Sequence, residues 1–155
     1  MENMTGLLSN PIFLSALFSW FLAQLLKALI ELIRNRPLKA RDILITFVWT
    51  TGGMPSSHSA LVTAICVAVG LEVGINSTIF IVTFFYGMLT IRDALGVRRA
   101  AGSQAKAINE MTNVVNSKLD SNLKNVKEIH GHTSGEVTAG IFVGLVIAVL
   151  FTVLL

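Results

Sequence analysis

The sequence is poor in charged residues and almost free of cysteine. Only 14% of its residues are Asp, Glu, Lys or Arg, whereas soluble domains carry roughly 25%. This deficit and the mean hydropathy of +0.70 place the chain among membrane proteins. The single cysteine, Cys66, lies inside an apolar run, which excludes an intrachain disulfide and a cysteine metal cluster. No glycine-rich nucleotide-binding motif and no internal repeat is present, and we expect one domain over residues 1–155 and no cofactor.

Four apolar stretches are candidates for membrane crossing. A helix needs about 20 apolar residues to cross a bilayer, and the stretches Ile12 to Ile33 and Val137 to Leu155 meet this length. The two middle stretches are shorter, so we extend them into their polar flanks, as Ser57 to Ile75 and Asn76 to Asp93. Such polar ends are expected where they line a cleft that is enclosed by protein.

Two further segments lie between these spans. The apolar octet Ile43 to Thr50 is too short to cross and is expected to be interfacial or re-entrant. From about Gln104 to Asn116, apolar residues recur at helical spacing, which predicts an amphipathic helix against the bundle or the membrane surface. The predicted fold is therefore all-α: an integral membrane helical bundle of four transmembrane helices with an amphipathic interfacial helix.

The positive charges are distributed unevenly along the chain. Of the 12 Lys and Arg residues, 11 lie in the two loop regions between Arg34 and Lys127, and Lys27 lies late in the first span. Four crossings put both loops on one side, and the positive-inside rule makes that side the cytoplasm and leaves both termini outside. We expect a bacterial cytoplasmic membrane. Since topology explains the charge, we expect no nucleic-acid partner.

The segment Met54-Pro-Ser-Ser-His-Ser59 has the features of a helix start. Ser56 or Ser57 is the expected N-cap, and the free backbone N–H groups of such a helix end bind anions. His58 lies in the first turn, where it can give or take a proton. The structural alternative is an ordinary cap with a solvated histidine.

His132 and Glu136 are four residues apart, so their side chains meet on one helix face or across a helix start. A carboxylate on one ring nitrogen fixes the histidine tautomer and makes the other nitrogen a better nucleophile or base. The spacing also suits a metal pair, for which Asp93 is a candidate further ligand.

Basic side chains near the span ends are candidate anion ligands. Lys27 lies inside a span and needs a partner, which a structural pair with Glu31 could supply. Arg92 and Arg98 flank the end of the third span, with Asp93 as a neutralising neighbour.

Two motifs, Pro55-Ser-Ser-His58-Ser59 and Gly131-His132-Thr-Ser-Gly-Glu136-Val-Thr-Ala-Gly140, resemble signatures of the type 2 phosphatidic acid phosphatase and vanadium haloperoxidase superfamily. The octet that ends in Ser59, together with Asp93-Ala-Leu-Gly-Val-Arg-Arg99, is similar to its divergent branch of small membrane proteins, labelled acid phosphatase/vanadium haloperoxidase-related. The resemblance covers about Gln24 to Gly144.

The resemblance implies a role for each matching residue. His132 would attack phosphorus and form a phosphohistidine, Glu136 would orient it, and His58 would protonate the leaving alcohol. Hydrolysis in this superfamily needs no metal. The residues that the resemblance assigns to phosphate binding are Lys27, Arg36, Ser56 and Ser57.

The chain also departs from the superfamily pattern. The smaller departures are eight rather than six residues between Lys27 and Arg36, Ser57 in place of glycine, and Glu136 in place of aspartate. The largest is the absence of a Ser-Arg pair, because Asn125 and Val126 stand in its positions. Arg92 or Arg98 is the candidate for the missing guanidinium. Four spans are also fewer than the usual six.

We therefore expect a phosphoric monoester hydrolase, embedded in the membrane, that hydrolyses a lipid or polyprenyl phosphate through a histidine nucleophile on the cytoplasmic side. One alternative is a non-catalytic phospholipid or polyprenyl-phosphate binding or transport protein that retains the anion pocket. Another is a metal-assisted enzyme that uses Asp93, Glu136 and a histidine. The expected partners are the bilayer and its lipid substrate, and small residues in the last span permit a homodimer.

Overall fold

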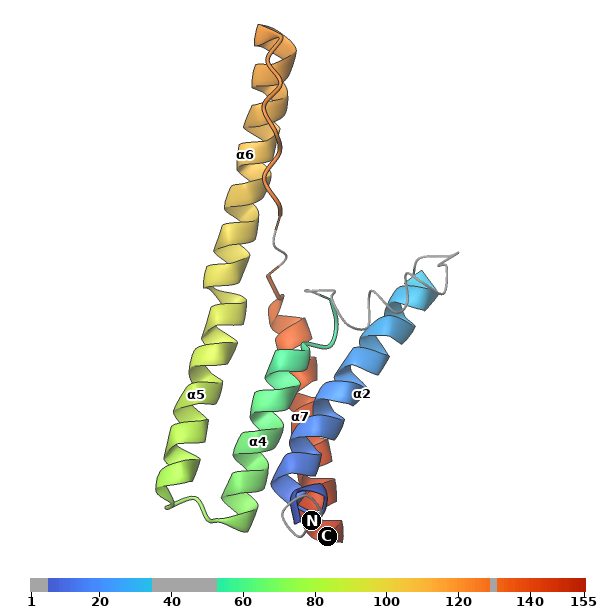
Figure 1. Cartoon of the computed structure of the whole chain (residues 1–155), viewed down its shortest axis with the longest axis vertical. Coiled ribbons are helices and arrows are strands. Elements are labelled where there is room, and N and C mark those ends of the chain that lie inside the picture. The colour runs from blue at the N-terminus through green and yellow to red at the C-terminus, as the bar shows by residue number, and fades with distance from the viewer. Residues whose placement is uncertain (1–5, 35–52, 129–130) are drawn as a thin grey trace.

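The computed structural model describes residues 6–34, 53–128 and 131–155, and these ranges contain helices and no strand. The predicted class, an all-helical membrane bundle, is confirmed. Figure 1 shows α2, α4 and α7 side by side, α5 next to α4, and both termini at the same end of the bundle. The octet 43–50 and Arg36 lie outside the described residues. The helices are α2 (Pro11–Arg34), α4 (Ser57–Glu72), α5 (Thr78–Leu95), α6 (Val97–Leu119) and α7 (Ser134–Leu154).

The bundle body consists of α2, α4, α5 and α7. The helical segments Pro11–Ile33, Thr78–Leu119 and Ser134–Leu154 are long and apolar enough to cross a membrane. The remaining helix, α4, has 16 residues and is about 24 Å long, which is shorter than the roughly 30 Å hydrocarbon core. Because α2, α5 and α7 all contact α4, protein rather than lipid surrounds much of this short helix.

Polar caps start the helices. At the start of α2, Asn10 Oδ1 accepts hydrogen bonds from the N–H groups of Ile12 and Phe13 at 2.9 and 3.1 Å. Ser77 Oγ accepts from the Phe80 N–H at 3.2 Å at the start of α5. Each cap satisfies donors that have no partner within the helix and that lipid could not satisfy.

Glycines bring α4 and α7 into backbone contact. A Cβ on Gly140 would collide with the carbonyl oxygen of Ser56, and one on Gly144 would collide with that of Ala60. The two glycines are four residues apart, so they lie on one face of α7 and form the Gly-x-x-x-Gly pattern of close membrane helix pairs. The small residues that we considered for a homodimer thus serve a contact within the chain. Fully buried alanines continue this core: Ala64, Ala68 and Ala148.

The amphipathic helix, α6, is longer than predicted and does not pack along the bundle. We expected residues 104–116 to lie against the bundle or the membrane surface. Contact with the bundle is not found, because α6 continues α5 and contacts only that helix among the described elements, and a position at the membrane surface stays a prediction. Together α5 and α6 span 42 residues, about 63 Å, and α6 projects beyond the bundle (Figure 1). The physical reason is at Gly96, which lies between the two helices but keeps the helical hydrogen bonding: its N–H donates to Arg92 O and its carbonyl accepts from the Ala100 N–H.

Two asparagines of α6 hold the chain that returns toward the bundle. Asn109 pairs with the backbone of Val126, donating to its carbonyl at 3.0 Å and accepting from its N–H at 2.8 Å. Asn116 pairs with Leu123 in the same way, at 3.0 and 2.9 Å. The returning segment therefore runs along α6 and leads back to the start of α7.

Candidate active site

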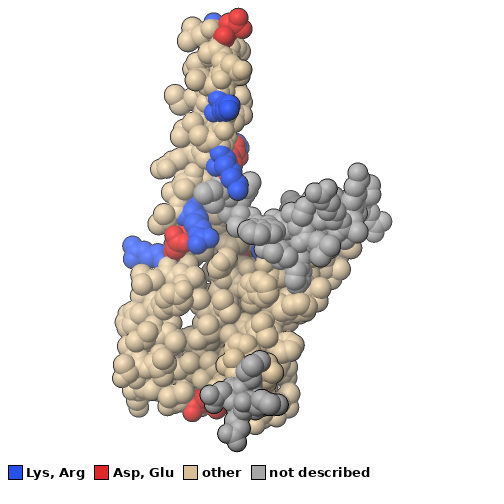
Figure 2. Space-filling model, viewed as in Figure 1, with Lys and Arg blue, Asp and Glu red and all other residues tan. Residues whose placement is uncertain are grey.

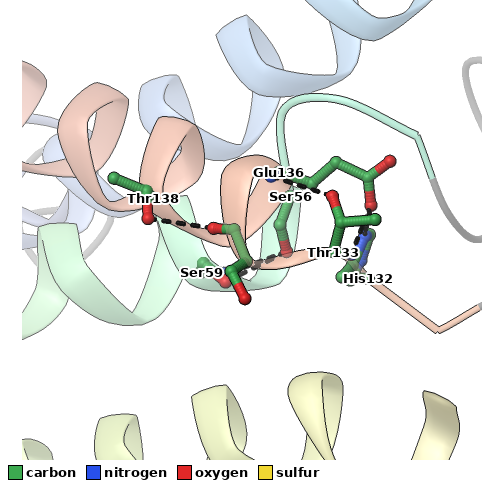
Figure 3. A network of polar contacts seen from close by, with 7 residues as sticks. Ser56, Ser59, His132, Thr133, Glu136 and Thr138 are labelled. Atoms are coloured by element: carbon green, nitrogen blue, oxygen red, sulfur yellow. Dashed lines mark hydrogen bonds and ion pairs between the residues drawn. The ribbon is translucent and has the colours of Figure 1, made fainter.

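His132 lies just before α7 and is held by the residues that start this helix. Its Nδ1 is 3.2 Å from Glu136 Oε2, and the residue is only 7% exposed. The same oxygen accepts the Thr133 N–H at 2.9 Å, while Thr133 Oγ1 accepts the Glu136 N–H at 3.4 Å (Figure 3). This capping box fixes the carboxylate. When Nδ1 carries the proton toward Glu136, the lone pair of Nε2 is available for chemistry.

The start of α4 is hydrogen-bonded to the start of α7. Ser56, the N-cap of α4, donates its backbone N–H to Glu136 O at 2.9 Å. Its Oγ accepts from the N–H and the hydroxyl of Ser59 at 3.4 and 3.0 Å (Figure 3). Because Ser56 is fully buried and used in this way, a structural role explains it, and its contact with phosphate stays a prediction. Ser57 begins the helix, where geometry leaves the N–H groups of Ser57 and His58 without an intrahelical acceptor.

The junction of α5 and α6 packs against the chain that precedes α7. His132 donates its backbone N–H to Ala94 O at 3.3 Å. A Cβ on Gly131 would collide with the backbone of Arg99, so only glycine fits this contact. The junction also carries an ion pair between Arg98 Nε and Asp93 Oδ2 at 2.6 Å. This packing brings the ion pair to the histidine end of α7.

His58 is the second residue of α4, and its side chain is exposed. The charged or ionisable groups that act on it electrostatically are Arg98, His132, Lys27 and Asp93, which come from four different segments. The two histidines of the separate sequence motifs therefore share one electrostatic environment. Such convergence is required if one is to act as nucleophile and the other as acid.

Lys27 reaches this region from the buried face of α2. It is only 5% exposed, and a Cβ on Gly53 would lie 3.6 Å from its Cγ, so its stem packs beside the chain that enters α4. Glu136 is the opposite charge that acts on its ammonium. Lys27 and the two histidine motifs thus contribute side chains to the same end of the bundle.

The basic candidates differ in their placement. Arg92 and Arg98 are both exposed, but Arg98 is one of the charged groups that act on His58, so Arg98 is the better candidate for the missing guanidinium. Arg36 lies outside the described residues. Figure 2 shows Lys and Arg side chains where α5 passes into α6 and along α6, above a bundle face that is almost uncharged. This is the charge distribution from which the sequence predicts topology.

Metal ligation finds little support in the described residues. Within residues 6–34, 53–128 and 131–155, no group of three or more His, Cys, Asp or Glu side chains is placed to hold an ion. Asp93, the candidate further ligand, is instead paired with Arg98.

Thr133 and Gly131 belong to the motif that the sequence analysis quotes, but reasoning from sequence gave neither residue a role. Thr133 belongs to the pattern Thr-x-x-Glu, a capping-box signature that could have revealed its contact with Glu136. Gly131 had no comparable signal, because its reason is a backbone contact with Arg99, a residue that is distant in sequence.

Comparison with known proteins agrees with these motifs. The family described as the Divergent PAP2 family matches residues 8–147, which include every residue of the described site. The chain belongs to this family. A family relative in Bacillus subtilis (strain 168), "Uncharacterized membrane protein YuiD", is 39% identical over 160 residues, covering 94% of this chain and 98% of the relative. No solved structure matches the chain. The resemblance to a divergent phosphatase branch is therefore confirmed at the level of family.

Proposed function

We propose that the protein is a membrane-embedded phosphatase that hydrolyses a lipid or polyprenyl phosphate through a phosphohistidine on His132. The observation that carries this proposal is the buried contact of His132 Nδ1 with Glu136, at 3.2 Å, next to His58, Lys27 and Arg98. Membership of the Divergent PAP2 family supports it.

The phosphate binds where the first turn of α4 meets basic side chains. The free N–H groups of Ser57 and His58 donate to its oxygens, aided by the partial positive charge of the helix N-terminus. Lys27 and Arg98 balance its negative charge. A phosphoryl group in transfer spreads charge over its oxygens, so donors and cations that are already in position stabilise the transition state.

In the first chemical step, the Nε2 lone pair of His132 attacks phosphorus and the bond to the leaving oxygen breaks. Protonated His58 gives its proton to that oxygen, and an alcohol leaves. Glu136 stabilises the positive charge that the phosphorylated imidazole carries. In the second step, His58 takes a proton from water while the water oxygen attacks phosphorus. The P–N bond then breaks, and the products are inorganic phosphate and the original histidine.

The position of the site favours an amphiphilic substrate. It lies at the end of the bundle where the basic side chains gather, and the positive-inside rule places that end in the cytoplasm. A phosphate bound there lies near the membrane surface, and the rest of a lipid can remain in the bilayer.

The test is phosphate release from a panel of lipid and polyprenyl phosphates by the purified full chain, with and without EDTA. The variants are His132→Ala and His58→Ala, with Lys118→Ala near the far end of α6 as the control. We expect release that survives EDTA, is lost in both histidine variants and is unchanged in the control. Loss of phosphate release in the presence of EDTA would favour the metal-assisted enzyme. Tight binding without release would favour a non-catalytic carrier.

A further inference from the structure

An apolar crevice of about 300 Å³ lies between α4 and α5, with α7 contributing one wall. Figure 2 shows the surface of the bundle hollowed on the side where α5 lies. The residues that define the crevice include Val62 and Cys66 of α4, Phe84, Gly87 and Ile91 of α5, and Ile141 of α7.

Gly87 is the residue of α5 that faces Val62 of α4 at the crevice. A Cβ on Gly87 would lie 3.8 Å from Val62 Cβ, an ordinary van der Waals distance. A methyl group at position 87 would therefore fit in contact with Val62, and a larger side chain there would extend into the crevice that Gly87 lines. Phe84 borders this space on α5, and its ring stacks on Phe80 at a centroid distance of 6.2 Å.

The crevice begins directly beneath the candidate active site. Val62 and Cys66 follow His58 at intervals of four residues, which places all three on one face of α4. On α5, Ile91 lies one turn before Ala94, whose carbonyl accepts the backbone N–H of His132. Polar groups that suit an anion are thus continuous with apolar walls that suit a hydrocarbon.

We infer that this crevice receives the hydrocarbon chain of the phosphorylated lipid, an inference that rests on the proposed function. Its volume is about twice that of a ~150 Å³ apolar cavity that binds benzene, so it has room for about a dozen carbon atoms. That is one chain segment rather than two chains side by side. A chain that leaves the bilayer gains little from the hydrophobic effect, so the fit between chain and walls decides selectivity. The crevice therefore favours a lipid phosphate that inserts a single slender chain, and Gly87 sets its width.

Photo-crosslinking of the full chain in lipid nanodiscs tests this inference. The probe is a single-chain lipid phosphate with a diazirine within its first dozen carbons. The variants are Gly87→Phe, which fills the crevice, Gly87→Ala, whose Cβ fits, and Leu89→Phe, which enlarges a side chain that is 63% exposed on α5. We expect adducts on the crevice walls and a loss on the order of tenfold in Gly87→Phe, the size of a mismatch in an apolar pocket. The other two variants should retain the adducts.

Cys66 provides a second readout that does not depend on the folding of a variant. It is the chain's only cysteine, so an apolar maleimide labels a single position in the wild-type protein. The lipid phosphate should slow this labelling, and inorganic phosphate at the same concentration should not. Equal protection by both, or adducts spread evenly over the lipid-facing residues of α5, would overturn the inference.

Phosphate release separates this inference from the proposed function. Crosslinking in the crevice without phosphate release from any substrate would reject the proposed phosphatase activity and keep the crevice as the binding site of the hydrocarbon chain. Equal phosphate release by Gly87→Phe and Leu89→Phe, from single-chain and double-chain lipid phosphates alike, would reject the crevice as a hydrocarbon-binding site and keep the proposed phosphatase activity.

Discussion

The two sides of α4 differ in how they are packed. Toward α7, Gly140 and Gly144 let the helices meet at the backbone, where neither position has space for a Cβ. Toward α5, Gly87 leaves a crevice, and the only buried residues of α5 are Gly87 and Ala94. The tight side fixes the two histidine motifs relative to each other, as the proposed phosphatase reaction requires. The loose side leaves room for a ligand. One short helix can thus position the chemistry and border the substrate chain.

The largest effect on phosphate release is expected from a variant of Glu136, at the end of the α4–α7 contact where the candidate active site lies. Glu136→Gln keeps the shape and a carbonyl acceptor for the Thr133 N–H, but removes the charge beside His132 Nδ1. Phosphate release should fall on the order of 10²–10⁴-fold, the range for general acid–base and orienting groups.

Thr133→Ala is the matched control for that variant. It removes the side-chain cap, at a cost of about 1 kcal/mol of stability, and leaves the carboxylate on His132. Its melting temperature should fall more than that of Glu136→Gln, while its activity falls less. The opposite ranking would mean that Glu136 serves the helix rather than the histidine.

The next effect concerns the basic group that the α5–α6 junction supplies. Arg98→Ala should lower phosphate release roughly 10- to 100-fold, the value of a hydrogen bond to a charged group. Arg92→Ala, on the exposed last turn of α5, should change it little. Equal losses in the two variants would show that only the overall positive charge matters.

Gly140→Ala tests the backbone contact between α4 and α7. The added methyl group collides with Ser56 O, so we expect destabilisation by about 1–3 kcal/mol, the usual cost of overpacking. Gly135→Ala is the control in the same helix, because its Cβ would meet nothing within 4 Å. Thermal unfolding in detergent measures both. Indistinguishable melting temperatures would contradict the tight packing described for this side.

The smallest effect is expected on the outer face of α5. Val82→Ala removes methyl groups from a side chain that is 58% exposed, so the stability should change by less than about 0.5 kcal/mol. Unfolding in detergent at two protein concentrations is the measurement. A larger loss that depends on concentration would show that a second copy covers this face.

Sequence alone predicts much of this molecule. Apolar length gives the helices, and the polar ends of the spans make His58, His132 and Glu136 candidate site residues, because ionisable groups near lipid are costly unless they have a function. It does not tell which neighbour a glycine face meets, so Gly140 and Gly144 suit a homodimer and an internal contact equally well.

Two further features do not follow from the sequence pattern. The direction of α6 is set at Gly96, which caps α5 yet keeps the hydrogen bonding of a helix on both sides. The distinction between Arg92 and Arg98 follows from how that junction packs against His132. Local patterns contain neither piece of information.

The most direct test of the central claim is to trap the phosphoryl group on the protein. The full chain is incubated briefly with a lipid phosphate that carries ³²P, quenched in alkali and digested for mass spectrometry. The account predicts an alkali-stable, acid-labile label on His132 that is absent from His132→Ala. Phosphate release without a label on His132 would contradict the account. Phosphate release that is undiminished in His132→Ala would contradict it as well.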